Sequence, residues 1–473
     1  MASISSAGIG SGLDVKSIIT QLMAIESQPK DKLAADATKI QSQISEVGKI
    51  TSAMSTLRDV SSKLSSSSFW SQTTASSSNA SVTVTSSSSS LAANYSVEVQ
   101  QLASSQALMS GQTFAASTAL VGSGTLNIEM GTWGAGQTSF APASTPSSAS
   151  ITVDSTDTVE SLRDKINAAG IGVSASILSD SSGARLVMRS TGTGADNAFR
   201  VTPGGATGGV ATLGYDPSSA LTGATRTQTA SNAMATIDGV SVTSSTNTFT
   251  DVLDGVSITA KAVTTEVASV TVGNDTASIK AKLKEFATAY TALNSLIAAD
   301  TKYDPSTKKA GLLQGDSTIV GLQTRLRSLL GTTSTASAEY SRLSDAGFEL
   351  QRDGSLTVNE TKVDNALSNF GEIQALFINN TSVTSSGEGF GQQFYDATYS
   401  VLTTGGSLNS RSTALTDKLT RNQKSQDALT SRLAQTQKML EAQYGALDTQ
   451  MASFNGLSSY VTQQVAQWNK TTG

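Results

Sequence analysis

The sequence of 473 residues contains no cysteine and no histidine. Without cysteine there is no disulfide framework, thiol nucleophile or iron–sulfur cluster. Without histidine the commonest metal ligand and the usual general base at neutral pH are missing. These absences exclude Ser-His-Asp hydrolases, zincins and zinc fingers, and we predict no metal, no cofactor and no enzymatic activity.

Charge is also scarce, because Asp, Glu, Lys and Arg make up 15% of the chain against about 25% in an average soluble domain. The net charge is −5, and no block presents the basic stripe that nucleic acids require. The longest apolar runs, such as 375–378, are too short to cross a membrane. The first fifteen residues lack a basic n-region and an apolar h-region, so we expect no Sec signal peptide.

The two ends of the chain have helical periodicity. From Pro29, placed in the first turn, to Leu64, apolar residues recur at steps of three and four, which predicts an amphipathic helix. A second series of this kind runs from Leu415 to Trp468. Two such helices can form an extended coiled coil, with an ordinary helical hairpin as the alternative. The residues expected to pack in the first helix are Ile40, Ile44, Val47, Met54 and Leu57.

Three polar residues interrupt the apolar pattern of the C-terminal helix, namely Asn422, Gln426 and Thr436. Polar seam residues can set the register or the oligomeric state of a coiled coil. The alternative is that they meet water in a loosely packed helix.

Between about 71 and 276 the period changes to two, which predicts strands. Asp238-Gly239 and Asp254-Gly255 suit tight hairpin turns. One helix interrupts the strands at 158–169, with Thr158 as its cap, whereas the Gly- and Thr-rich stretch 192–223 reads as loop. Helices resume after 275, with a short hairpin near 348–358.

We therefore predict a multidomain α+β protein in which both termini form a helical stalk or leg and β-rich head domains are inserted between them. The expected outer leg comprises 1–40 and 430–473, and the leg domain comprises 41–71 and 275–429. One head domain comprises 72–108 and 230–274, and the second comprises 109–229.

No motif for phosphate or calcium binding is present. Carboxylate pairs such as Asp154 and Asp157, or Asp251 and Asp254, are the remaining enzyme option, as in a glycan hydrolase. Because each lies beside Thr, Ser or Gly, we interpret them as turn and cap residues.

Several segments resemble the flagellar hook-associated protein 2 family of filament cap proteins. They are GIGSGLDVKSIITQLMAIESQP at 8–29, ATIDGVSVTSSTNTFTDVLDGVSITA at 235–260, and the segment 343–377 that begins LSDAGFEL. The segments 123–128 and 151–190 are similar to a module shared by flagellins and hook-associated proteins.

The resemblance implies a structural protein that forms a homo-oligomeric ring, typically a pentamer, at the extracellular tip of the flagellum. Such a protein retains exported flagellin and promotes its polymerisation, and it contacts the hook–filament junction proteins. It leaves the cell by the flagellar type III route, with a chaperone on its C-terminal region. Under this reading the assembly contacts lie at both ends of the chain: Gly8, Gly10, Gly12, Leu13, Asp14, Ile18, Leu22, Leu433, Leu440, Leu447, Met451 and Phe454.

Two other readings remain open. The chain is alternatively a surface adhesin or fibre-like binding protein, since a Ser/Thr-rich β head on a helical stalk has the same appearance, and a cap can itself serve cell adhesion. It is alternatively another axial protein, such as a flagellin or a different hook-associated protein, against which the GSGLDV opening argues.

Overall fold

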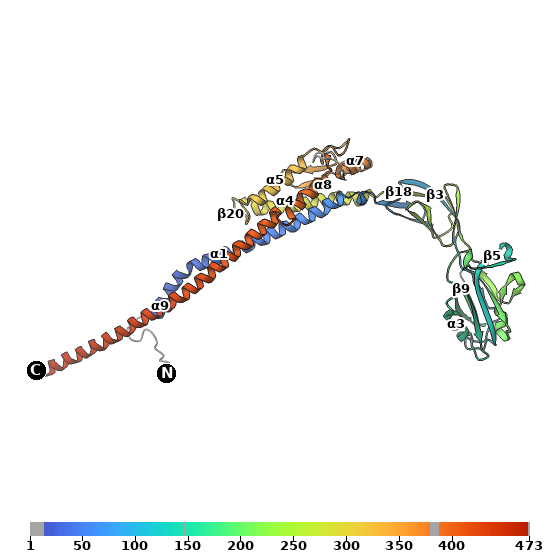
Figure 1. Ribbon diagram of the computed structural model, residues 1–473, viewed down its shortest axis with the longest axis horizontal. Coiled ribbons are helices and arrows are strands. Elements are labelled where there is room, and N and C mark those ends of the chain that lie inside the picture. The colour runs from blue at the N-terminus through green and yellow to red at the C-terminus, as the bar shows by residue number, and fades with distance from the viewer. Residues whose placement is uncertain (1–13, 145–146, 379–386, 472–473) are drawn as a thin grey trace. The chain divides into compact units, whose positions relative to one another are not determined.

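The computed structural model describes residues 14–144, 147–378 and 387–471 (Figure 1). Within these ranges the chain forms two compact units. The leg unit combines the residues up to Ser67 with those from Thr276 onward, and the head unit comprises Ser68–Asp275. The chain leaves the leg unit after Ser67, forms the head unit, and returns to the leg unit at Thr276.

The leg unit is built on two long helices, α1 (Val15–Leu64) and α9 (Ser407–Thr471), which lie side by side in Figure 1. Two further helices, α4 (Thr276–Thr301) and α8 (Phe390–Leu402), pack on α1. The remaining elements are α5 (Ser317–Gly331), α6 (Glu360–Ser368), α7 (Phe370–Ile378), the hairpin β19 (Tyr303–Asp304) and β20 (Lys309–Ala310), and the hairpin β21 (Phe348–Leu350) and β22 (Leu356–Val358).

Aromatic rings fill the centre of the leg unit. The Phe286 ring lies edge-on to Phe394 at 5.0 Å and to Phe348 at 5.9 Å between ring centroids. Phe348 in turn lies 6.0 Å from Phe377. These edge-on contacts join α4, α7, α8 and the β21–β22 hairpin around one core.

The prediction that Pro29 lies in the first turn of the N-terminal helix is wrong. The helix begins about four turns earlier, at Val15, and Pro29 lies inside it. Proline removes one backbone hydrogen bond and crowds the preceding turn. Here the affected segment is at the surface, where both Ile25 and Pro29 are exposed, so water can solvate the freed carbonyl.

In the head unit, the residues next to the leg in sequence form the first of two β cores. Its sheets have the orders β1-β18-β3-β14-β15 and β16-β17-β2, and all pairs are antiparallel. A short helix, α2 (Ser67–Trp70), precedes β1. The strands are β1 (Thr73–Ser77), β2 (Val82–Ser86), β3 (Ala93–Gln101), β14 (Ala233–Ile237), β15 (Val240–Ser244), β16 (Thr248–Leu253), β17 (Val256–Ala260) and β18 (Ala268–Asn274).

Both predicted Asp-Gly turns occur in this first core. Asp238 and Gly239 join β14 to β15 with φ of +47° and +81°, the left-handed pair that a tight hairpin favours. Asp254 and Gly255 join β16 to β17, and Gly255 also has a positive φ of +70°.

The second β core contains two sheets, in the orders β12-β11-β10-β5-β6 (with β7 also on β5) and β13-β4-β9-β8. Its strands are β4 (Ala107–Met109), β5 (Gly124–Trp133), β6 (Phe140–Pro142), β7 (Ser148–Val153), β8 (Val173–Asp180), β9 (Gly183–Ser190), β10 (Ala198–Gly204), β11 (Tyr215–Asp216), β12 (Leu221–Thr222) and β13 (Thr225–Gln228). The predicted helix is α3 (Val159–Ala168), where Thr158 and Ser161 form a capping box.

The stretch 192–223, predicted to be loop, contains a central strand. β10 pairs with β5 over seven residues and buries Phe199 and Val201. Only these two apolar residues alternate with polar ones, and Gly and Thr residues surround them. The period-two pattern of a strand is therefore too short to recognise in the sequence. The segment contains three strands of one sheet, β10, β11 and β12.

Backbone hydrogen bonds and one asparagine side chain join the two β cores. Ser104 and Ser231 exchange backbone hydrogen bonds of 2.9 and 3.1 Å. Next to them, Asn247 Oδ1 accepts from the Ala103 N–H at 2.7 Å, and Gly194 N–H donates to the Ser104 carbonyl at 3.1 Å. The Asn247 side chain thus takes the place of a strand partner for the Ala103 backbone, where the chain passes from one β core to the other.

Candidate assembly surface

The central feature of the leg unit is an antiparallel pair made by α1 and α9. Residues 36–43 of α1 lie opposite 418–425 of α9, whereas Leu33 lies opposite Gln426, so the numbering runs in opposite directions. Ile40 of α1 and Leu415 of α9 are buried, and the seam farther along is only half-buried.

One polar residue of the α9 seam, Gln426, forms a hydrogen bond across to α1. Gln426 Nε2 donates to the Leu33 carbonyl at 3.4 Å and to Asn422 Oδ1 at 2.7 Å. Asn422, Gln426 and Thr436 are all half-buried. A carboxamide that pairs with one backbone position on the facing helix favours a register role for this part of the seam.

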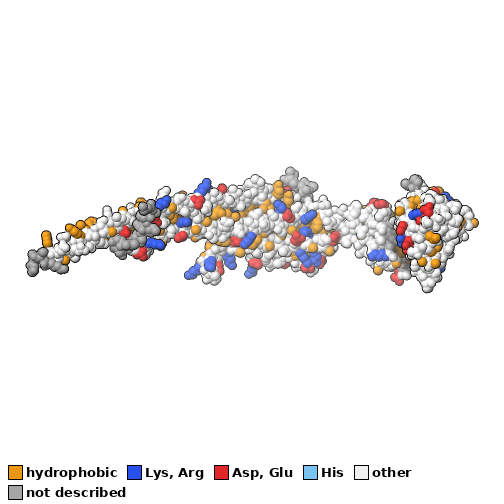
Figure 2. Space-filling model, turned by 90° about the horizontal axis from the view of Figure 1, so that it is seen from below, with side chains coloured by type: hydrophobic (Ala, Val, Ile, Leu, Met, Phe, Trp, Pro, Cys, Tyr) orange, Lys and Arg blue, Asp and Glu red, His pale blue; other side chains and the backbone are white. Residues whose placement is uncertain are grey.

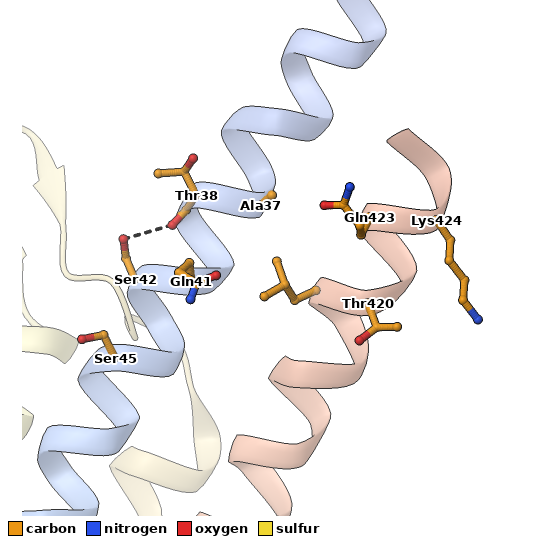
Figure 3. A pocket seen from close by; sticks show the side chains of 9 residues that line it. Ala37, Thr38, Gln41, Ser42, Ser45, Thr420, Gln423 and Lys424 are labelled. Atoms are coloured by element: carbon orange, nitrogen blue, oxygen red, sulfur yellow. Dashed lines mark hydrogen bonds between the residues drawn. The ribbon is translucent and has the colours of Figure 1, made fainter. Parts of the chain in front are cut away.

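A groove of about 730 Å³ opens along one side of this pair (Figure 3). Its α1 wall carries small or uncharged side chains, and Lys424 on α9 is its only charged residue. The lining residues are Ala37, Thr38, Gln41, Ser42, Ser45, Leu419, Thr420, Gln423 and Lys424.

Beyond this paired region α9 exposes an apolar stripe. Extending the antiparallel pairing places the start of α1 opposite about residue 444. Past that point large apolar side chains continue along α9, and Figure 2 shows hydrophobic side chains along this end. The exposed residues are Leu447, Met451, Phe454, Leu457, Tyr460, Val461, Val465 and Trp468, with Trp468 75% and Phe454 65% exposed.

The start of α9 is fixed to the body of the leg unit by a charged pair. Arg411 Nε donates to Asp316 Oδ2 at 2.6 Å, and the Asp316 side chain is 5% exposed. Asp316 also caps α5, because its Oδ1 accepts from the Thr318 N–H at 3.1 Å. An aspartate before a helix is a recognisable cap in sequence, but no local signal identifies Arg411, 95 residues away, as its partner.

One carboxylate between α1 and α4 is poorly satisfied. Asp300 Oδ2 is buried and has no hydrogen-bond partner among the described residues. Burial raises the pKa of the Asp300 carboxyl above its usual range, nearby Glu46 raises it further, and Lys49 opposes both effects. Glu46 is itself paired with Lys49 at 2.8 Å.

Asp300→Asn should therefore raise the melting temperature of the chain at pH 7. A folded-state pKa above the unfolded value means that folding takes up a proton, so this carboxyl destabilises the ionised protein and the penalty fades as the pH falls through the folded pKa. Thermal melts of both proteins between neutral pH and about pH 4 measure the difference. A difference that stays constant with pH would contradict this assignment.

The structure places the predicted residues in three groups. Gly8, Gly10, Gly12 and Leu13 lie outside the described residues. Val47, Met54 and Leu57 are fully buried and Ile40 is 3% exposed, whereas Ile44 is half-buried. Of the proposed assembly residues, Ile18, Leu22, Leu433 and Leu440 are half-buried, and Leu447, Met451 and Phe454 are exposed.

Asp14 has a local structural role. It is the N-cap of α1, where its Oδ1 accepts from the Ser17 N–H at 2.9 Å. This is the ordinary task of an aspartate in front of a helix. Sequence reasoning missed the groove, the Asp316–Arg411 pair and the buried environment of Asp300, because each depends on residues far apart in the chain.

Of the carboxylates considered for hydrolysis, Asp154 and Asp157 take part in the head unit's own structure. Asp157 accepts from the Asp154 N–H at 2.7 Å and pairs with Lys165 at 2.5 Å. The Asp157 pKa is lowered on balance: burial raises it, and the Lys165, Asp154 and Ser161 hydrogen bonds outweigh that effect. No cluster of three or more Asp, Glu, Cys or His that suits a metal ion occurs within the described ranges.

Among the helices that the structure describes, none combines the length and the apolar content needed to cross a membrane.

The fold described so far is that of a multidomain α+β protein in which both chain ends form one helical unit and a β-rich unit is inserted between them. Family models agree over most of the chain. The model for the flagellar hook-associated protein 2 N-terminus matches residues 11–106, that for its C-terminus matches 230–456, and a flagellin hook IN motif matches 143–192. The chain belongs to the flagellar hook-associated protein 2 family, whose members cap the bacterial flagellar filament.

Curated relatives and solved structures support this assignment. The chain is 28% identical over 479 residues to flagellar hook-associated protein 2 of Escherichia coli K12, covering 98% of both chains. It is 30% identical over 397 residues to the B-type protein of Pseudomonas aeruginosa, covering 80% of this chain and 79% of that one. The crystal structure of the D1-D2-D3 domains of the flagellar cap protein FliD from Escherichia coli matches with a TM-score of 0.58 and 27% identity, covering 78% of this chain and 99% of that one.

Proposed function

We propose that this filament cap protein works as a closed homo-oligomeric ring, a pentamer, at the extracellular tip of the flagellum, where it retains flagellin and promotes its polymerisation. The observation that carries the proposal is the apolar stripe on α9 from Leu447 to Trp468. Contiguous exposed apolar side chains on a long helix mark an interaction surface. Burying them against other copies or against the filament end stabilises the assembled state.

In this proposal the two chain ends make the assembly contacts, and the buried residues of α1 stabilise the core of the leg unit. Ile18, Leu22, Leu433 and Leu440 hold α1 and α9 together, while Leu447, Met451 and Phe454 face the neighbouring subunits. Gly8, Gly10, Gly12 and Leu13, which lie outside the described residues, belong to the same terminal segment by sequence.

The remaining partners follow from the same role. The chain passes through the flagellar type III export route with a cytoplasmic chaperone on its C-terminal region, where the exposed stripe needs protection before assembly. At its destination it meets flagellin and the hook–filament junction proteins. No catalytic step is involved, in keeping with the structural use of the Asp154 and Asp157 carboxylates.

Electron microscopy of the purified full-length chain at rising concentration tests the ring. We expect closed particles with five copies, and a Leu447→Gln, Met451→Gln, Phe454→Gln variant should remain monomeric. The matched control Thr449→Gln, Ser453→Gln changes exposed residues of the same helix segment and should assemble normally. Open chains, or assembly of the triple variant, would contradict the proposal.

A further inference from the structure

The fold brings cationic side chains from distant parts of the sequence together beside the α1–α9 pair. A second groove beside the α1–α9 pair, of about 350 Å³, is lined by Lys39, Lys418 and Arg421 with Asp36 as its single carboxylate. The first groove, defined by the residues around Lys424, carries only that one charge. The two faces of the same helix pair therefore differ in charge.

The β19–β20 hairpin extends this charged face. Gln43 lines the second groove and donates through Nε2 to the Leu312 carbonyl at 2.8 Å, which holds the segment after the hairpin against α1. The base of the hairpin is closed by the Gly311 N–H, which donates to the Lys302 carbonyl at 2.9 Å. Lys302, Lys308 and Lys309 are all exposed here, and Figure 2 shows basic side chains gathered at this protrusion.

The hairpin presents its lysines from a fixed turn. Asp304 Oδ1 accepts from the Ser306 N–H at 2.9 Å and from Ser306 Oγ at 2.6 Å, and Asp304 Oδ2 accepts from Thr307 Oγ at 2.7 Å. The only carboxylate of the hairpin is thus engaged inside its own turn. None of the six cations Lys39, Lys302, Lys308, Lys309, Lys418 and Arg421 has an ion-pair partner among the residues that the structure describes.

We infer that this cationic face, defined by those six residues, is a docking surface for a carboxylate-rich polypeptide. The groove and the hairpin carry these six cations and two carboxylates, Asp36 and Asp304, although the net charge of the whole chain is −5. Unpaired charges of one sign attract a partner of the opposite sign. The inference goes beyond the capping role, because it specifies the chemistry of a partner at the side of the leg.

The chemistry of the groove favours a polypeptide over a nucleic acid. Asp36 lies within the groove and would repel a continuous phosphate backbone, whereas separate carboxylates can avoid it. The other polar residues that line the groove, namely Gln43, Asn422 and Ser425, are uncharged. Single-stranded nucleic acids also rely on aromatic stacking, and Tyr303 is the single aromatic residue of the hairpin.

The test measures binding of fluorescent poly-L-glutamate to the full-length chain by anisotropy. Affinity should fall on going from about 50 to about 200 mM salt, because exposed charges are screened. The variant Lys418→Glu, Arg421→Glu should bind at least about tenfold more weakly than the parent. The variant Lys308→Gln, Lys309→Gln should also weaken binding, which shows that the hairpin belongs to the same surface.

The matched control is Lys424→Glu, Lys438→Glu, which makes the same change in net charge at exposed positions on α9 outside the cationic face. It should weaken binding less than about threefold. Equal losses in both variants would show that net charge alone governs binding and would overturn the inference. A single-stranded oligonucleotide that binds as tightly as poly-L-glutamate, with the same dependence on Lys418 and Arg421, would overturn the choice of a polypeptide.

Discussion

Met54→Asp should lower the free energy of unfolding of the leg unit by about 4 kcal/mol or more. Met54 is fully buried in α1, among other buried residues of the leg core. The substitution removes apolar burial and leaves a carboxylate that must be desolvated or protonated. Thermal and denaturant melts of the purified chain measure the loss.

Met439→Asp is the matched control for this change. Met439 lies on α9 with 52% of its surface exposed, so the same substitution should change the stability by less than about 0.5 kcal/mol. An unchanged melting midpoint for Met54→Asp would refute the packing of α1 in the leg core. A loss in Met439→Asp as large as that in Met54→Asp would show that the helices respond to charge rather than to burial.

Deleting both chain ends, residues 1–35 and 435–473, should abolish filament growth while the remaining core still folds. The removed part of α9 carries the stripe from Leu447 to Trp468, which contains eight exposed large apolar side chains. The core helices α4, α5 and α8 and the aromatic cluster around Phe286 lie outside the deletion. A complementation assay for filament length and a melt of the truncated chain measure the two outcomes.

Proteolysis checks why the ends matter. We expect the ends to be ordered fully only on assembly, because the half-buried pairing of the two chain ends offsets little of their ordering entropy and Gly445 and Gly456 each cost about 1 kcal/mol. Trypsin should therefore cut the monomer first near Lys16, Lys30, Lys32 and Lys438, and these sites should be protected in the assembled cap. Protease-resistant ends in a verified monomer would mean that the terminal helices belong to a stable globular leg.

Periodicity was enough to predict the long helices and much of the β region. The three- and four-residue spacing of Ile40, Val47, Met54 and Leu57 corresponds to one buried face of α1. Local chemistry was equally informative at Thr158, whose capping box begins α3, and at the Asp-Gly turns. Each of these signals is contained within a few residues.

Features that combine distant segments were not accessible in this way. β10 is a central strand only because β5 pairs with it from 70 residues earlier, so its Gly- and Thr-rich surroundings were read as loop. Pro29 appeared to begin a helix, but packing along α9 continues the helix through it. The cationic face likewise arises from α1, α9 and the β19–β20 hairpin together, and the sequence shows no basic block at any of them.

The capping role is tested most directly in cells that lack this chain. Electron microscopy of the cells and measurement of flagellin in the culture medium should show hooks without filaments and flagellin released as monomer. Reintroducing the intact chain should restore filaments and clear the medium. Filaments of normal length on the deletion strain, with flagellin retained, would contradict the account and would favour an adhesin or another surface role.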